Sequence, residues 1–236
     1  PELSLARAEG RLAGLGATWR RARHFPRVVL PSSLIDALAA ALPVPMIAWL
    51  FGAAEAGQFA LVWRVAALPG SLIVASFGDV FHAHATAART DGPPRVRGLL
   101  LGTMRMLALL SVAVYVPACL LAPWVFPWLF GEPWRPAGQM MLVLAPLWMA
   151  SLVVSPLSRL PMVLGRPGLK LVFDACFLVL PLGALWFFAP QGLMTAVLAY
   201  GIAAAVAYAV FGLLLYDTAG RRAVDAHPDR SGPEKE

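Results

Sequence analysis

This chain contains six apolar segments, each close to the length of about 20 residues that an α-helix needs to cross a bilayer. They lie at about 31–51, 57–83, 98–122, 137–160, 168–188 and 192–216. Of the 236 residues, 59% are hydrophobic and 14% are charged, whereas soluble domains contain about 25% charged residues. We therefore expect an all-α integral membrane protein, a bundle of six transmembrane helices.

The polar ends of the chain define the rest of its organisation. Residues 1–30 are basic, and four leucines between positions 3 and 15 form a loose amphipathic pattern. Such a segment is typical of a helix that lies on the inner membrane face and is held there by anionic lipids. We expect a cytoplasmic linker at 1–30, the transmembrane bundle at 31–216 and a polar cytoplasmic tail at 217–236.

Basic residues are distributed unevenly between the two sides of the predicted bundle. In a soluble protein the net charge of +6 would suggest nucleic acid, but here it fits the preference of cytoplasmic loops for Lys and Arg, so we expect no nucleic-acid partner. One side holds sixteen of these residues and the other only Arg135, which predicts that both termini are cytoplasmic. The side of Arg135 carries aromatic residues typical of an interfacial belt, namely Trp49, Phe51, Trp124, Phe126, Trp128, Phe130, Trp134 and Trp186.

Five of the six segments contain proline, at Pro43, Pro45, Pro69, Pro117, Pro146, Pro156 and Pro181. Proline removes a helical hydrogen bond and bends the helix. Several bent helices together favour a bundle around a cavity, as in many transporters. In the sixth segment, Gly201 and the alanines at 203, 205, 207 and 209 predict close contact with another helix.

The second segment contains an arginine, Arg64, about 10 Å inside its predicted outer end at 1.5 Å per residue. A charge at this depth is a functional hypothesis by default. Helical steps from Arg64 lead through Ser71 and Gly78 to His82, so one face of the span is small or polar. That face either packs against another helix or lines a cavity, and an arginine favours the cavity. Arg64 itself either snorkels to the interface or meets an anion.

Four more charged residues lie in the cytoplasmic third of their spans, namely Asp36, Asp79, Arg105 and Asp174. We hypothesise an ion pair between Asp36 and Arg105, although Arg105 can equally reach the interface by snorkelling. Lys170 precedes Asp174 by one helical turn, and Asp79 lies beside His82, so both carboxylates have a candidate local partner. The candidates for cavity lining are Asp36, Ser71, Gly78, Asp79 and His82.

The sequence lacks the patterns of cofactor, metal and covalent catalytic sites. It contains no phosphate-binding Gly-x-x-x-x-Gly-Lys-Ser/Thr loop, no Gly-x-Ser-x-Gly and no His-Glu-x-x-His. His82 and His84 point to different sides of a helix, which disfavours a metal site. Cys119 and Cys176 fall in different spans and are expected to be unpaired. We expect a protein that is not an enzyme and has no cofactor.

Two groups of residues resemble the signatures of a transporter family. The first comprises His24-Phe-Pro26 through Pro31, Leu42-Pro43, Leu50-Phe-Gly52, Ala56-Gly57-Gln-Phe-Ala-Leu61, Arg64 and Leu68-Pro69. The second comprises Leu129-Phe-Gly-Glu-Pro-Trp134, Ala137-Gly138 and Leu144-Ala-Pro146. These residues resemble the polysaccharide-biosynthesis translocases, the O-antigen and exopolysaccharide flippases of the multidrug/oligosaccharidyl-lipid/polysaccharide superfamily.

The resemblance implies a function in the inner membrane of a bacterium. Such translocases have two six-helix bundles and move polyprenyl-diphosphate-linked oligosaccharides from the inner to the outer leaflet by alternating access. This chain resembles the C-terminal bundle, so an N-terminal six-helix bundle and membrane lipids are expected partners. Arg64 and Arg105 would then attract the diphosphate of the substrate. Asp36 departs from the family pattern, where a neutral amide is usual.

The chain begins at Pro1 without a methionine, and we therefore expect it to be a piece of a longer protein. Three alternative functions remain open. A drug or cation exporter of the same superfamily would need a committed carboxylate deep in its cavity. A membrane enzyme of glycan assembly would need large outer loops with acid–base residues. A single bundle could also be a scaffold that transports nothing.

Overall fold

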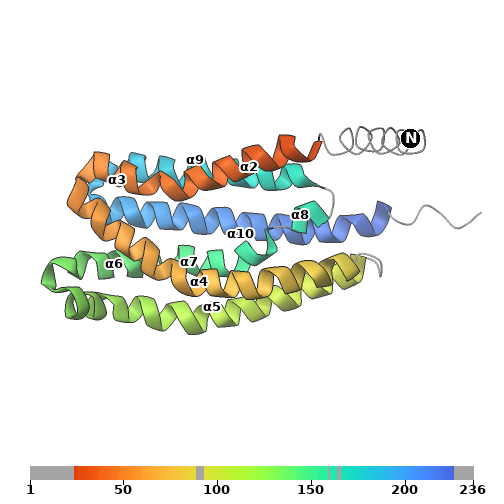
Figure 1. Cartoon of the computed structure of the whole chain (residues 1–236), viewed down its shortest axis with the longest axis horizontal. Coiled ribbons are helices and arrows are strands. Elements are labelled where there is room, and N and C mark those ends of the chain that lie inside the picture. The colour runs from red at the N-terminus through yellow and green to blue at the C-terminus, as the bar shows by residue number, and fades with distance from the viewer. Residues whose placement is uncertain (1–23, 89–92, 159, 164–165, 226–236) are drawn as a thin grey trace, which may run out of the picture.

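The computed structural model describes residues 24–88, 93–158, 160–163 and 166–225 (Figure 1). The described residues form helices and no strand. The helices are α2 (His24–Ala41), α3 (Pro43–Phe51), α4 (Ala53–Ala88), α5 (Pro93–Phe130), η1 (Glu132–Trp134), α6 (Arg135–Val143), α7 (Ala145–Val154), η2 (Ser155–Leu157), α8 (Leu160–Val163), α9 (Pro167–Phe188), η3 (Ala189–Gln191) and α10 (Leu193–Asp225). The predicted amphipathic pattern near the N-terminus lies outside the described residues, as does most of the tail.

The structure confirms the predicted all-α class. Among the described residues, five stretches are long and apolar enough to cross a membrane, namely Leu30–Phe51, Ala53–Ile73, Arg97–Phe130, Gly168–Gln191 and Leu193–Ala219. A sixth crossing results if the pair Glu132–Val143 and Ala145–Leu157, bent by 49°, is one broken span. Several helices are longer than their apolar segments, and α5 extends the predicted 98–122 at both ends.

Consecutive spans run in opposite directions, so that α2 begins and α10 ends at the same end of the bundle (Figure 1). The connections at the other end are short and turn on Gly52, Gly131 and Gly192. Their φ angles are +117°, +94° and +101°, a region in which residues with a side chain are strained. Glycine at these three positions therefore lets the chain reverse within a few residues.

Proline divides two of the spans into separate helices. The first span is divided at Leu42, just before Pro43, and the fourth at Leu144, two residues before Pro146. The helices α4, α5 and α9 instead continue through Pro69, Pro117 and Pro181. The sequence predicted bends at all of these prolines. The helix is interrupted completely only where proline lies in the first turn of a new helix. That is the position in a helix that tolerates proline best.

The core of the bundle is built around α10, which contacts α5, α6, α7 and α9. Its buried small residues include Gly201, Ala204 and Ala207. A Cβ on Gly201 would lie 3.0 Å from Leu144, so this glycine permits close helix contact, as the sequence predicted. Ala209, which belonged to the same predicted contact, is exposed, because steps of two residues do not follow one face of a helix.

The helices α5 and α6 approach each other still more closely. A Cβ on Gly138 would lie only 2.4 Å from the carbonyl oxygen of Ala122. Nearby, buried Tyr115 of α5 donates a hydrogen bond of 2.8 Å to the carbonyl oxygen of Ala66 in α4. Cys119 of α5 is a buried free thiol and Cys176 of α9 is an exposed one.

Aromatic residues collect at the end of the bundle that carries the three glycine turns. Five of the eight predicted belt residues are exposed, namely Trp49, Trp124, Trp128, Phe130 and Trp186, as expected for side chains at a membrane interface. Phe126 is an exception, because only 3% of it is exposed. It packs instead against Phe130, with 5.8 Å between the ring centroids.

Candidate functional site

Arg64 lies on the exposed side of α4, away from the core of the bundle. Phe59, Val62 and Ala66 occupy the buried side of the same helix and are at most 1% exposed. Arg64 is exposed, and no ion pair joins it to any residue that the structure describes. Its charge is therefore not compensated by the described part of this bundle.

The face of α4 beyond Pro69 is described only in part. Ser71 is exposed, and its hydroxyl donates a hydrogen bond of 2.9 Å to the carbonyl oxygen of Leu68 in the same helix. The helix continues to Ala88, so Gly78, Asp79 and His82 are helical. Their side chains lie outside the described part of the structure, and the polar stripe toward His82 stays a prediction.

Arg105 also lies on the outside of the bundle, on α5. Leu107 is fully buried, whereas Arg105 is exposed next to Met106 and one turn before Leu109. The hypothesised pair between Arg105 and Asp36 is not formed, because the carboxylate of Asp36 contacts Lys170 instead. Sequence separation could not identify this partner, since Asp36 and Lys170 are 134 positions apart.

Lys170 of α9 is the centre of a charged cluster between α2 and α9. Its Nζ lies 2.8 Å from Oδ2 of Asp36 and 2.7 Å from Oδ1 of Asp174. The Asp174 side chain is fully buried and accepts a further hydrogen bond from the hydroxyl of Ser32. Two carboxylates and one ammonium leave one negative charge in excess. The cluster joins α2 to α9 through charge-assisted hydrogen bonds, which are the stronger kind.

A cavity of about 250 Å³ lies inside the bundle beside this cluster. Residues of α2, α4, α7, α9 and α10 line it, namely Asp36, Ala39, Ala40, Trp63, Leu147, Trp148, Ser151, Phe173, Phe177 and Tyr208. Of these, only Asp36 and Ala40 are exposed, and both belong to α2. The α2 side of the cavity is therefore its most exposed side, and aromatic side chains make up most of the other walls.

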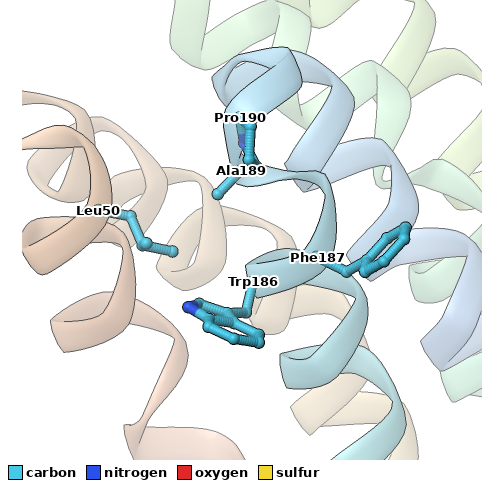
Figure 2. Close-up of a pocket in the computed structure, with 5 residues that line it drawn as sticks. All are labelled: Leu50, Trp186, Phe187, Ala189 and Pro190. Carbon is cyan, nitrogen blue, oxygen red and sulfur yellow. The ribbon is translucent and has the colours of Figure 1, made fainter.

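A second pocket, of about 470 Å³, lies near the end of the bundle with the glycine turns. Its lining is apolar and comes from Leu50, Trp186, Phe187, Ala189 and Pro190. Figure 2 shows Leu50 of α3 pointing toward the ring of Trp186, whereas Phe187 points away on the other side of α9. Trp186 and Phe187 are 61% and 70% exposed, so this pocket is a shallow apolar surface that suits lipid chains.

The two groups of signature residues meet in the structure. The side-chain nitrogen of Gln58, from the first group, donates a hydrogen bond of 2.9 Å to the carbonyl oxygen of Pro133, from the second. Beside it, the guanidinium of Arg135 forms two hydrogen bonds of 2.9 and 2.8 Å with the carboxylate of Glu132. Gln58 therefore ties α4 to the turn between α5 and α6, a structural role.

The sequence did not identify the cavity as a unit. Trp63, Tyr208 and the neighbouring pair Trp148 and Ser151 belong to three different helices, and only packing brings the three helices together. The available signal was weak, namely polar or indole groups at isolated positions in otherwise aliphatic spans.

A model of the family of polysaccharide biosynthesis proteins matches residues 14–139, a little over half of the chain. The match covers α2 to α5, the turn η1 and the start of α6, and it includes Arg64, Arg105 and the bond between Gln58 and Pro133. Neither a curated protein nor a solved structure matches the chain. This chain, a bundle of membrane-spanning helices, belongs to the family of polysaccharide biosynthesis proteins.

Proposed function

We propose that this chain is one bundle of a flippase in the bacterial inner membrane. In this proposal the complete transporter moves a polyprenyl-diphosphate-linked oligosaccharide from the inner to the outer leaflet, for O-antigen or exopolysaccharide synthesis. A second six-helix bundle forms the opposite wall of the transport pathway. Both ends of this chain are cytoplasmic, and the chain carries out no covalent chemistry.

The observation that carries this proposal is the position of Arg64. An arginine on an outward face of a transmembrane helix is costly unless it meets polar surroundings or an anion. The described part of the bundle supplies neither, and Ser71 continues the same exposed side of α4. A water-filled pathway between two bundles would meet this requirement, and a family that acts in polysaccharide biosynthesis supplies an anionic, lipid-linked glycan as the natural occupant.

The proposed mechanism follows from charge. The planar guanidinium of Arg64 presents several donors to phosphate oxygens, and Arg105 adds positive potential nearer the cytoplasmic side. The glycan crosses through the polar pathway while the polyprenyl chain stays in lipid beside the bundles. A membrane potential that is negative inside favours outward movement of the anion, by about 2.3 kcal/mol per charge per 100 mV if the whole field is crossed.

Substitution of Arg64 in the full-length protein, in its own cells, tests the proposal. Arg64→Ala is expected to lower polysaccharide export by about 10- to 100-fold and to cause lipid-linked glycan to accumulate, because one or two charge-assisted hydrogen bonds of about 1.5–3 kcal/mol are lost. Arg64→Lys should retain part of the activity. Arg135→Ala is the matched control, since Arg135 is exposed and pairs with Glu132. Unchanged export by a normally expressed Arg64→Ala protein would show that the cation role is wrong.

One observation favours a second candidate, an exporter of organic cations. Asp36 lines a cavity that is rich in aromatic side chains, a combination that suits cations. Its carboxylate is, however, already paired with Lys170. Loss of resistance to cationic dyes in Asp36→Asn, with polysaccharide export unchanged, would support the exporter over the flippase.

A further inference from the structure

The cavity beside the charged cluster has two aromatic walls. Trp63 of α4 and Trp148 of α7 form one wall, with 4.8 Å between their ring centroids and an edge-to-face arrangement. Phe177 of α9 and Tyr208 of α10 form part of the other, also with 4.8 Å between centroids. A ligand between these two walls would contact ring faces and ring edges. The third side is the short face of α2 with Asp36.

Polar groups are placed among these rings. The hydroxyls of Ser151 and Tyr208 and the carboxylate of Asp36 belong to the cavity lining. The indole N–H of Trp148 is buried and has no hydrogen-bond partner in the described part of the structure. Only 6% of this residue is exposed. Buried donors in folded proteins almost always have a partner. Because Trp148 belongs to the cavity lining, an acceptor on a bound ligand is a candidate for the missing partner.

We propose that this cavity binds one sugar ring of a carbohydrate. A pyranose has axial C–H groups that pack on the negative faces of aromatic rings and hydroxyls that both donate and accept hydrogen bonds. A ring hydroxyl oxygen accepts the indole N–H of Trp148, and other hydroxyls donate to Asp36 and exchange hydrogen bonds with Ser151 or Tyr208. The choice of carbohydrate rests on the proposed function, whereas the site itself is separate from the arginines.

The chemistry of the cavity favours a neutral sugar over an organic cation. The carboxylate of Asp36, which lines the cavity, already lies 2.8 Å from the ammonium of Lys170, so a positive ligand would have to share this carboxylate with Lys170. The indole N–H of Trp148 has no acceptor in the described part of the structure, and a quaternary ammonium cannot offer one. A sugar hydroxyl carries no positive charge and can accept the indole N–H.

The size of the cavity limits what it holds. A volume of about 250 Å³ is slightly below the range of about 300–1,000 Å³ that holds drug-sized ligands. A volume of this size suits one sugar ring better than a longer glycan. The remaining sugars would extend past α2, the side of the cavity on which Asp36 and Ala40 are exposed.

Saturation-transfer difference NMR on the full-length protein tests this site. The protein is placed in lipid nanodiscs without glycolipid or glycoside detergent, and the probes are the methyl glycosides of glucose, galactose, mannose and N-acetylglucosamine. At least one glycoside should bind, and its affinity should fall about five- to tenfold in Trp148→Phe, which loses one hydrogen bond. Tyr208→Phe, which removes only a hydroxyl, is a second variant should Trp148→Phe not fold. Trp186→Phe, at an exposed tryptophan outside the cavity, should bind as the unchanged protein does.

Two results would overturn the inference, namely the absence of binding by every glycoside and binding that is unaffected by both cavity variants. If tetramethylammonium binds and no glycoside does, the cavity is a cation site instead. The outcome is separate from that of the proposed function. If glycosides bind while Arg64→Ala exports polysaccharide normally, the sugar site stands and the role of Arg64 fails. If no glycoside binds while Arg64→Ala blocks export, the sugar site fails alone.

Discussion

At the scale of single residues, Lys170 is the cation that pairs with both carboxylates of the charged cluster. It holds the fully buried carboxylate of Asp174 and the half-exposed one of Asp36 at 2.7 and 2.8 Å. A buried ion pair contributes little compared with an apolar replacement, but it becomes costly when one partner is removed. The two carboxylates therefore differ in what they require, since Asp36 retains access to polar surroundings and Asp174 does not.

This difference predicts the effect of substituting each member of the cluster. Lys170→Met should lower the free energy of unfolding by about 3–5 kcal/mol, because Asp174 is left buried with an uncompensated charge. Asp36→Asn should cost at most about 1 kcal/mol, the usual value for an exposed pair. Thermal unfolding of the purified protein in detergent measures both. Equal effects of the two substitutions would contradict the proposed roles.

A double substitution separates the effect of charge on stability from the effect of packing. Lys170→Met with Asp174→Leu removes the buried charge together with its partner, so most of the stability lost in Lys170→Met should return. If the double variant is less stable than Lys170→Met alone, the helices α2 and α9 depend on the cluster for more than charge neutrality.

At the scale of helices, the arrangement of α5 against α6 depends on one glycine. A methyl group on Gly138 would lie 2.4 Å from the Ala122 carbonyl oxygen, a backbone atom that cannot move independently of α5. Gly138→Ala should therefore push the two helices apart and destabilise the protein by more than about 1–3 kcal/mol, the usual cost of overpacking. Thermal unfolding and the yield of folded protein in detergent would show this.

Gly102→Ala is the matched control, because a Cβ at this exposed position of α5 meets no atom within 4 Å. Alanine favours a helix interior over glycine by about 1 kcal/mol, so this variant should be as stable as the unchanged protein or slightly more stable. A loss of stability in Gly102→Ala as large as that in Gly138→Ala would show that the close approach of α5 and α6 is not the cause.

At the scale of the whole molecule, the spans could be predicted from local properties of the sequence, whereas the partner of a given side chain on another helix could not. The six spans follow from apolar length alone, and the structure has helices at all six positions. The sequence predicted a bend at Pro146, and the interruption at Leu144 lies two residues before it. The partner of Asp36 did not follow from the sequence, because it depends on packing between segments far apart in the chain, for which no local pattern exists. The sequence suggested Arg105 for Asp36 by charge and depth, two properties that Lys170 also has.

The predicted orientation of the bundle in the membrane is tested by cysteine labelling. In a protein with Cys119→Ala and Cys176→Ala, single cysteines are placed at Gln191, exposed in η3, and at Arg166, exposed before α9. These positions lie at opposite ends of α9, and the uneven distribution of Lys and Arg places Gln191 outside and Arg166 in the cytoplasm. A membrane-impermeant maleimide should therefore label Gln191→Cys in intact cells and Arg166→Cys only after permeabilisation. The reverse pattern would contradict cytoplasmic termini, and it would also place Arg64 near the inner leaflet, where it could not draw a diphosphate toward the outer one.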